Sequence, residues 1–309
     1  MQIWRWGALW LWLLVLPGTA WSQGAAPAWE DLQKQYALPA GQALEATREK
    51  LSETDDATLY KVTYRSTNGQ TVPALLFLPR RVKTPMPVVM LQHGLNRTKE
   101  DMLSDTMKAG LVKAGFAGFA IDAALHGERK APGKEPITAF FSADKTPIYQ
   151  TVADLRRGLD YLATVPEVDA KRIGYYGVSM GGMMGALAAG LDPRIRAPVL
   201  VLAWGDWGTL MENSDRLKEA ASSTLLTPEL VRQFMADVDP IYFVGHISPR
   251  PVLMQNGKTD RLVPPAAAEP LHKAAKEPKV VRWYPGGHDI YTDPAAIKDA
   301  VDFLQTNLK

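Results

Sequence analysis

The chain has 309 residues, of which 46% are hydrophobic and 22% charged, and its formal net charge at neutral pH is +2. This composition is that of a globular protein, and the near balance of charge gives no electrostatic basis for a nucleic-acid or anionic-membrane partner. Cysteine is absent, which excludes disulfides, thiolate metal sites, a cysteine nucleophile and lipid attachment through an N-terminal cysteine.

The first 22 residues have the layout of a signal peptide. Arg5 precedes an apolar run at residues 7–16, a Pro-Gly pair follows it, and small residues stand at Ala20 and Ser22. The run is too short to cross roughly 30 Å of hydrocarbon, which disfavours an uncleaved anchor. We therefore expect cleavage after Ser22, export to the periplasm or the extracellular space, and no membrane contact after removal of the signal.

A linker and a polar helical extension are expected at residues 23–54. Residues 59–65 and 72–78 then alternate β-branched or aromatic residues with polar ones, and Asn68-Gly69 lies between them. This pattern predicts two paired strands joined by a tight turn.

From there on, continuous apolar runs alternate with segments of helical period. The expected strands occupy residues 87–94, 115–122, 172–179, 197–204, 251–257 and 280–285, and the expected helices occupy residues 99–114, 151–164, 180–191, 264–276 and 294–308. Strands that alternate with helices imply an α/β fold. The prediction is one domain at residues 55–309, with a mostly parallel sheet of about eight strands and helices on both faces.

Residues 211–239 interrupt this alternation. The segment is largely polar, contains helix formers and carries Thr227-Pro228 near its middle. An excursion of this length after a strand is either a small lid over a site or a solvated helical insertion.

The sharpest chemical signal is Gly-Val-Ser-Met-Gly at residues 177–181, between a predicted strand and a predicted helix. In this context the serine must occupy a tight, strained turn, and flanking glycines allow the strand and the helix to approach closely. The motif predicts Ser179 as a nucleophile. The alternative is a glycine-rich turn with an incidental serine.

A serine hydroxyl needs a positioned base, and the chain offers five histidines. His288 follows the last predicted strand, at the sheet edge where the nucleophile is expected, and is the best candidate. His272 lies in a predicted helix and His246 before a proline, so both are more typical of surface or packing positions. His93 and His126 each precede a glycine at a strand end.

The base needs an acid that fixes its tautomer. Asp260 follows the strand at residues 251–257 and lies at the carboxyl end of the sheet, where ligands and catalytic loops gather in open α/β folds. The order Ser179, Asp260, His288 along the chain is the one that a serine nucleophile on such a strand-turn-helix in an α/β fold requires. The alternative for Asp260 is a turn-forming aspartate.

Acyl transfer also needs donors for the developing oxyanion. The backbone N–H of Met180, at the start of the helix, is expected to be the first. The second is expected in the loop after the strand that ends in His93-Gly94, from Leu95 or, failing that, Asn96. His93 itself is expected to shape this loop and not to act as a base.

Five segments together resemble a known family: LQHGLN, AID..LHGE, DAKRIGYYGVSMGG, PRPVLMQNGKTDRLVP and YPGGHD. From residue 72 to the C-terminus the chain is similar to the α/β-hydrolase superfamily, in its dienelactone-hydrolase, acetyl-xylan-esterase and prolyl-oligopeptidase-like branch. The resemblance implies an esterase or amidase mechanism carried by Ser179, Asp260 and His288, with Leu95 and Met180 as oxyanion donors.

Dienelactone hydrolases proper use a cysteine nucleophile. Because this chain has no cysteine, the resemblance favours an esterase over a dienelactone hydrolase. It also implies a structural D-x-x-x-H-G turn at Asp122 to Gly127.

The sequence thus predicts a serine carboxylesterase for a small-molecule ester substrate, which works through an acyl-enzyme and needs no metal or organic cofactor. Two alternatives stay open. One is a peptidase or amidase of the prolyl-oligopeptidase type, and the other is a binding protein that keeps the fold without turnover.

Overall fold

The structure is a computed structural model, and it describes residues 26–133, 144–221 and 226–309. The signal segment expected at residues 1–22 lies outside these ranges. Among the described helices, none combines the length and the apolar character that crossing a membrane requires.

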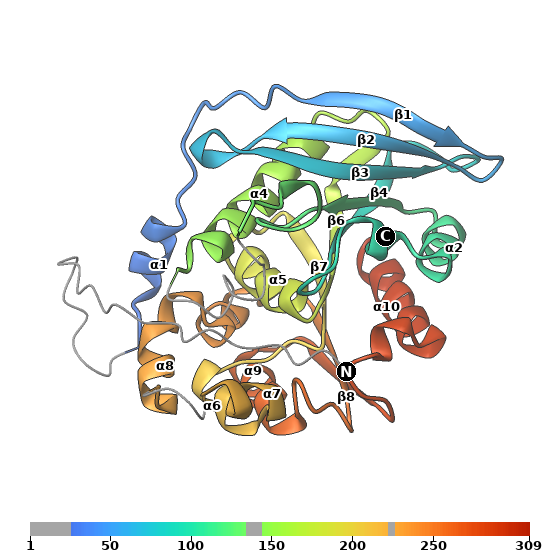
Figure 1. Cartoon of the computed structure of the whole chain (residues 1–309). Coiled ribbons are helices and arrows are strands. Elements are labelled where there is room, and N and C mark those ends of the chain that lie inside the picture. The colour runs from blue at the N-terminus through green and yellow to red at the C-terminus, as the bar shows by residue number, and fades with distance from the viewer. Residues whose placement is uncertain (1–25, 134–143, 222–225) are drawn as a thin grey trace, which may run out of the picture.

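One sheet runs through the molecule (Figure 1). Its strands are β1 (Thr47–Glu53), β2 (Ala57–Arg65), β3 (Thr71–Pro79), β4 (Met86–Gln92), β5 (Ala117–Ile121), β6 (Val168–Val178), β7 (Ile195–Val201), β8 (Val252–Gly257) and β9 (Lys279–Tyr284). Their spatial order is β1-β2-β3-β5-β4-β6-β7-β8-β9. Neighbouring strands pair antiparallel along β1-β2-β3-β5 and parallel along β5-β4-β6-β7-β8-β9. Parallel strands end at one edge, so the loops after β4, β5, β6, β8 and β9 meet there.

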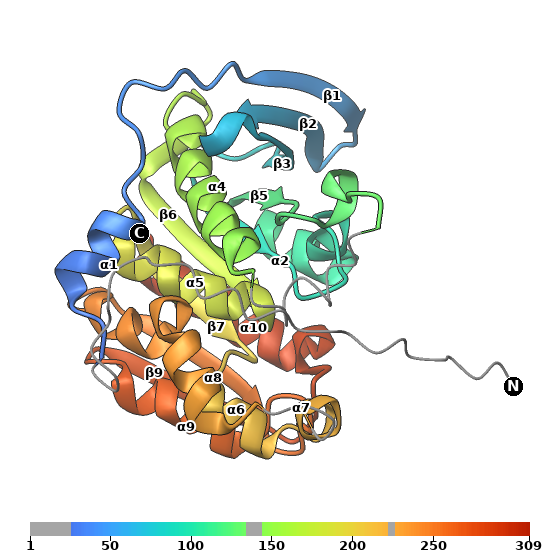
Figure 2. The ribbon, with the colours of Figure 1, turned by 60° about the vertical axis from the view of Figure 1, so that its left-hand side comes forward.

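Helices cover both faces of the sheet (Figures 1 and 2). They are α1 (Trp29–Gln35), α2 (Asp105–Ala114), α4 (Thr146–Leu162), α5 (Met180–Leu191), α6 (Trp207–Asn213), α7 (Asp215–Ala221), α8 (Pro228–Phe234), α9 (Pro265–Ala274) and α10 (Pro294–Asn307). Side chains of α4, α5 and α9 share one core cluster with the sheet, and side chains of α2 and α10 share the other. The α/β architecture expected from the sequence is therefore confirmed.

Local sequence explains where these helices begin and end. The Ser104 side chain accepts a hydrogen bond from the Met107 N–H at 3.3 Å at the start of α2, and Gly115 ends that helix at φ 73°. Asp293 caps α10 in the same way, followed by Pro294 in the first turn. These residues satisfy helix-end amides or adopt the left-handed conformation that stops a helix.

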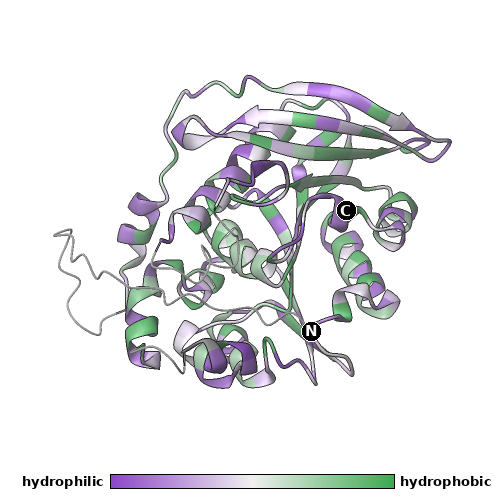
Figure 3. Cartoon of the chain, viewed as in Figure 1, coloured by the Kyte–Doolittle hydropathy of each residue, from purple (hydrophilic) through white to green (hydrophobic). Residues whose placement is uncertain are grey.

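Hydrophobic residues follow the central strands and α5 through the interior (Figure 3). All seven residues of β4 are buried, as are the last six of β6. Strands that are covered on both faces favour apolar side chains at nearly every position, which is why these segments form almost continuous apolar runs in the sequence instead of alternating ones.

The structure differs from expectation at the N-terminal end. The expected helix is limited to α1, and Thr47–Glu53 forms β1, which pairs antiparallel with β2. Nearly all of β1 is exposed, so its side chains show no apolar alternation. Its pairing with β2 depends on backbone hydrogen bonds and on a few polar side-chain contacts, such as the one between the Thr47 and Thr63 hydroxyls at 2.7 Å. This added strand brings the sheet to nine, one more than the approximate number expected.

The excursion at residues 211–239 contains the end of α6 and all of α7 and α8, with residues 222–225 outside the described ranges. Its two ends are joined by the buried carboxylate of Asp239. That carboxylate accepts hydrogen bonds from the N–H groups of Asp206 at 3.0 Å, Trp207 at 2.9 Å and Ile241 at 3.1 Å. Burial raises the pKa of Asp239 to about 6. The segment is thus fastened to the sheet domain at its base.

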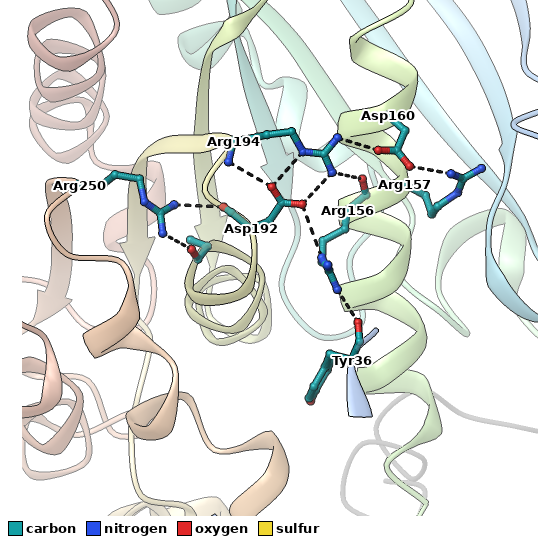
Figure 4. A network of polar contacts seen from close by, with 8 residues as sticks. Tyr36, Arg156, Arg157, Asp160, Asp192, Arg194 and Arg250 are labelled. Carbon is teal, nitrogen blue, oxygen red and sulfur yellow. Dashed lines mark hydrogen bonds and ion pairs between the residues drawn. The ribbon is translucent and has the colours of Figure 1, made fainter. Parts of the chain in front are cut away.

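A polar network attaches the N-terminal extension to the same domain (Figure 4). Asp192, just after α5, accepts hydrogen bonds from Arg194 at 2.7 and 2.9 Å and lies 3.6 Å from the Arg156 Nε. Arg156 of α4 donates to the Tyr36 carbonyl at 2.5 Å. Arg250 donates to the Asp192 carbonyl at 3.1 Å. Asp192, through its buried carboxylate and its backbone carbonyl, therefore helps to link α4, α5, the segment before β8 and the chain that follows α1.

Candidate active site

Ser179 stands at the turn between β6 and α5, with φ 54° and ψ −114°. This backbone conformation is strained for a residue with a side chain. The Ser179 N–H donates to the Val201 carbonyl of β7 at 2.7 Å, which holds the turn against the neighbouring strand. A Cβ at Gly181 would lie 2.2 Å from the Gln92 carbonyl of β4, so the helix can begin this close to the sheet only with glycine there.

The structure brings Ser179, His288 and Asp260 together. The His288 Nε2 lies 3.0 Å from the Ser179 Oγ, and the His288 Nδ1 lies 2.7 Å from the Asp260 Oδ2. A carboxylate only accepts hydrogen bonds, so the Nδ1–H donates to Asp260 and the Nε2 of the neutral ring accepts from the serine hydroxyl. These three side chains come from the loops after β6, β8 and β9.

The Asp260 carboxylate is fixed by its own loop. Its side chain is fully buried, and its Oδ1 accepts hydrogen bonds from the N–H groups of Leu262 at 2.8 Å and Val263 at 2.9 Å. The His288 side chain is 27% exposed, at the boundary between this buried acid and the open side of the site. The acid therefore orients the ring while the other ring nitrogen faces the serine.

Two backbone amides are available beside Ser179. Met180 is the first residue of α5, where an N–H has no acceptor within the helix. Leu95 is the second residue of the turn that the Arg97 N–H closes on the Gly94 carbonyl at 3.2 Å, and its N–H has no hydrogen-bond acceptor among the described residues. A Cβ at Gly94 would lie 3.5 Å from the Ser179 Cβ, so this turn lies against the serine.

The remaining histidines lie in other surroundings. The buried His93 ring accepts a hydrogen bond from the Ala123 N–H on Nε2 at 3.1 Å, so its Nδ1–H donates to the Gly94 carbonyl at 2.8 Å. Burial lowers the pKa of His93 to about 4. His126 bonds its own turn, His246 stacks on a tryptophan, and His272 bonds the side chain of Asn256 at 2.9 Å.

A cleft of about 540 Å³ opens over these groups. Met102 and Met107 line it from the α2 side, and Leu210 and Leu217 line it from the 211–239 segment and the adjoining end of α6. Within residues 26–133, 144–221 and 226–309, no three His, Cys, Asp or Glu side chains are arranged to hold a metal ion. The arrangement is an activated hydroxyl, an oriented base and two amides at the bottom of a largely apolar cleft, which is suited to acyl transfer.

Sequence reasoning missed several residues around the cleft. Arg97, Asp101, Arg216 and Tyr291 all line it, and Arg97 lies 3.6 Å from Asp101 and 3.3 Å from the Tyr291 hydroxyl. None of them belongs to a recognisable motif. Their positions depend on how loops from distant parts of the chain converge, which no local pattern records.

Two family models and a curated relative match the chain. The family model of acetyl xylan esterase (AXE1) matches residues 29–204, and that of the prolyl oligopeptidase family matches residues 143–309. The putative hydrolase YtaP of Bacillus subtilis (strain 168) is 30% identical over 263 residues, covering 77% of this chain and 84% of that protein.

Solved structures show the same fold. Acetyl xylan esterase 1 from Thermoanaerobacterium sp. JW/SL YS485 has a TM-score of 0.72 at 20% identity, covering 91% of this chain and 96% of that one. An acetyl xylan esterase from Paenibacillus sp. R4 has a TM-score of 0.71 at 20% identity, covering 91% and 93%. The family resemblance and the fold expected from the sequence motifs are confirmed.

The lowered pKa of His93 predicts a pH-dependent stability. The unfolded chain binds a proton at this ring near pH 6.5, whereas the folded protein binds it only near pH 4. The free energy of unfolding should therefore fall by about 1.4 kcal/mol per pH unit on this account as the pH drops through that window. Urea titrations between pH 4 and 7 measure the free energy of unfolding at each pH. In His93→Gln this free energy should depend less steeply on pH, by about 1.4 kcal/mol per pH unit, which corresponds to one proton. An unchanged slope would contradict the assignment.

Proposed function

The chain belongs to the α/β-hydrolase superfamily, in the branch of the acetyl xylan esterase and prolyl oligopeptidase families, and from this premise we propose that it hydrolyses carboxylic esters through an acyl-enzyme on Ser179. The observation that supports the proposal is the continuous hydrogen-bonded chain from the Ser179 hydroxyl through the His288 ring to the Asp260 carboxylate.

The proposed reaction has two similar halves. The Ser179 Oγ attacks the ester carbonyl while the His288 Nε2 takes the hydroxyl proton, and the carbonyl oxygen becomes an oxyanion between the amides of Met180 and Leu95. The protonated ring then gives its proton to the leaving alcohol, which leaves the acyl group on Ser179. Water, activated by the same ring, attacks this ester, and the acid is released as Ser179 regains its proton.

The names of the relatives support one substrate class. Acetyl xylan esterases by name act on acetylated xylan, so a small acetyl ester is the proposed substrate class. A peptidase or amidase activity is the second candidate, because the C-terminal part of the chain matches the prolyl oligopeptidase model. The same groups can attack either carbonyl.

Export is proposed as well, on the basis of the leader at residues 1–22. Expression of the full chain in a Gram-negative host should yield a periplasmic protein whose first residue is Gln23. N-terminal sequencing of the mature protein measures this directly. A protein that keeps Met1 and stays in the cytoplasm would contradict the proposal.

Removing the nucleophile should abolish turnover of p-nitrophenyl acetate. We expect Ser179→Ala to reduce kcat by at least about 10⁴-fold, and Asp260→Asn to reduce it by about 10⁴-fold because the ring loses its correct tautomer. Initial-rate assays measure both effects, and circular dichroism verifies that the variants are folded.

Asp289→Asn is the matched control for Asp260→Asn. This carboxylate is adjacent to His288 in sequence but accepts a hydrogen bond from the Gly287 N–H at 3.2 Å and does not contact the ring. Its replacement should leave kcat within about threefold, as for a surface substitution. Folded Ser179→Ala that retains turnover would refute the proposed nucleophile.

Ester and amide substrates separate the two candidate functions. We expect kcat/KM to be higher for p-nitrophenyl acetate than for aminoacyl-proline p-nitroanilides, because an esterase does not need a cleft that binds the peptide part of an anilide. Faster turnover of the anilides would favour the peptidase. Failure of a fluorophosphonate probe to label Ser179, with neither substrate turned over, would favour a binding protein.

A further inference from the structure

A buried ion pair lies at the end of the loop that carries Leu95. The Lys99 Nζ lies 2.7 Å from the Asp122 Oδ2, and the two side chains are 2% and 0% exposed. Glu100 at 2.9 Å and Glu128 at 2.8 Å from the same nitrogen complete the surroundings of the ammonium group. Both of these glutamates are exposed, so Asp122 is the one anion among the described residues that is buried against Lys99.

Asp122 also holds the backbone at this point. Its Oδ1 accepts a hydrogen bond from the Lys99 N–H at 3.0 Å, and its Oδ2 accepts one from the Glu128 N–H at 3.1 Å. The carboxylate is thus bonded to both the main chain and the side chain of Lys99. It fixes where the loop after β4 ends, in addition to neutralising a charge.

The beginning of the same loop is attached to the same segment. The His93 Nε2 accepts a hydrogen bond from the N–H of Ala123, the residue next to Asp122. Residues 93–99 are therefore held at both ends by the loop after β5. Between the two attachments lies the turn closed by the Arg97 N–H and the Gly94 carbonyl, with Asn96 at φ 61°.

The local sequence of the β5 loop is adapted to this carboxylate. Gly127 has φ 53°, and a Cβ there would lie 2.2 Å from the Asp122 Cγ and from both carboxylate oxygens. Any side chain at residue 127 would displace the carboxylate from Lys99. The glycine of the D-x-x-x-H-G pattern is therefore required, because only a residue without a side chain at position 127 leaves space for the Asp122 carboxylate.

Stability alone is a poor explanation for a buried ion pair. Removing two charges from water costs about as much free energy as their attraction returns, and apolar replacements are often as stable. A pair that also bonds the backbone of a functional loop contributes a defined geometry. Oxyanion donors need such a geometry, because a displacement of about 1 Å can reduce the rate by about 10²-fold.

We propose that the Lys99–Asp122 pair is a positioning device that holds the Leu95 N–H at the oxyanion site beside Ser179. This inference rests on the proposed esterase function. Lys99 and Asp122 act through the backbone of residues 93–99 and do not touch the reacting atoms.

The test uses a variant that leaves no buried charge without a partner. The double variant Lys99→Met/Asp122→Asn preserves the side-chain volumes and removes both charges. Gly127→Ala is an independent second variant, since its methyl group would push the carboxylate away from Lys99. Lys61→Met is the matched control, because Lys61 binds Glu128 at 2.6 Å from outside and has no contact with the loop.

All variants are assayed at a temperature where circular dichroism shows them fully folded. We expect kcat/KM for p-nitrophenyl acetate to fall about 10- to 100-fold in the double variant and in Gly127→Ala. The inhibition constant of a trifluoromethyl ketone, which forms an oxyanion on Ser179, should rise by the same factor. Lys61→Met should stay within about twofold in both measurements.

A purely structural role would lower the melting temperature of the folded variants and leave both constants unchanged. Amide hydrogen exchange over residues 94–98, which needs no substrate, should also accelerate in the double variant. Unchanged exchange together with unchanged kcat/KM would overturn the proposal. The double variant could also exchange faster while the wild type hydrolyses no ester. That result would support the positioning role of the Lys99–Asp122 pair and overturn only the proposed esterase function.

Discussion

The sharp reversal of the chain at Ser179 is the constraint on which the rest of the site depends. β6 must stop, turn through a positive φ and start α5 within one residue, and the Val201 carbonyl of the neighbouring strand holds that residue in place. The price is strained backbone at a single position, stabilised by the buried sheet around it. As a result, the hydroxyl lies 3.0 Å from the His288 Nε2, and the first turn of α5 begins at the next residue.

The other groups reach this point from separate loops, each fixed by its own contacts. Asp260 is held by two amides of its loop, and the turn at Leu95 is held by the loop after β5. His288, which is partly exposed, is oriented by Asp260. The parallel sheet brings these loops to one edge, while local hydrogen bonds determine the position of each group within it.

Much of this arrangement could be predicted because it has a local sequence cause. The run of apolar residues in β4 predicts a strand buried on both faces, and glycines around Ser179 predict a close strand-to-helix turn. The order of Ser179, Asp260 and His288 along the chain predicts that they converge. In each case the pattern within a short segment determines the structure of that segment or its place at the sheet edge.

What could not be predicted depends on contacts between distant segments. The polar sequence of β1 resembles a solvated helix, and its pairing with the distant residues of β2 makes it a strand. Lys99 has the sequence surroundings of a surface lysine, yet its side chain is buried because Asp122, far along the chain, lies beneath it. The walls of the cleft formed by α6 and α7 are likewise a result of tertiary packing.

β1 has a further consequence for the sheet as a whole. An edge strand exposes unpaired N–H and C=O groups to any other extended chain, and long flat edges promote aggregation. Here the outermost strand carries Arg48, Glu49 and Lys50, and its register with β2 shifts between Lys50 and Ser52. A second chain adding to this edge would meet dense charge and an irregular ladder of hydrogen bonds, so the hydrophobic strands behind it are shielded from growing into intermolecular sheet.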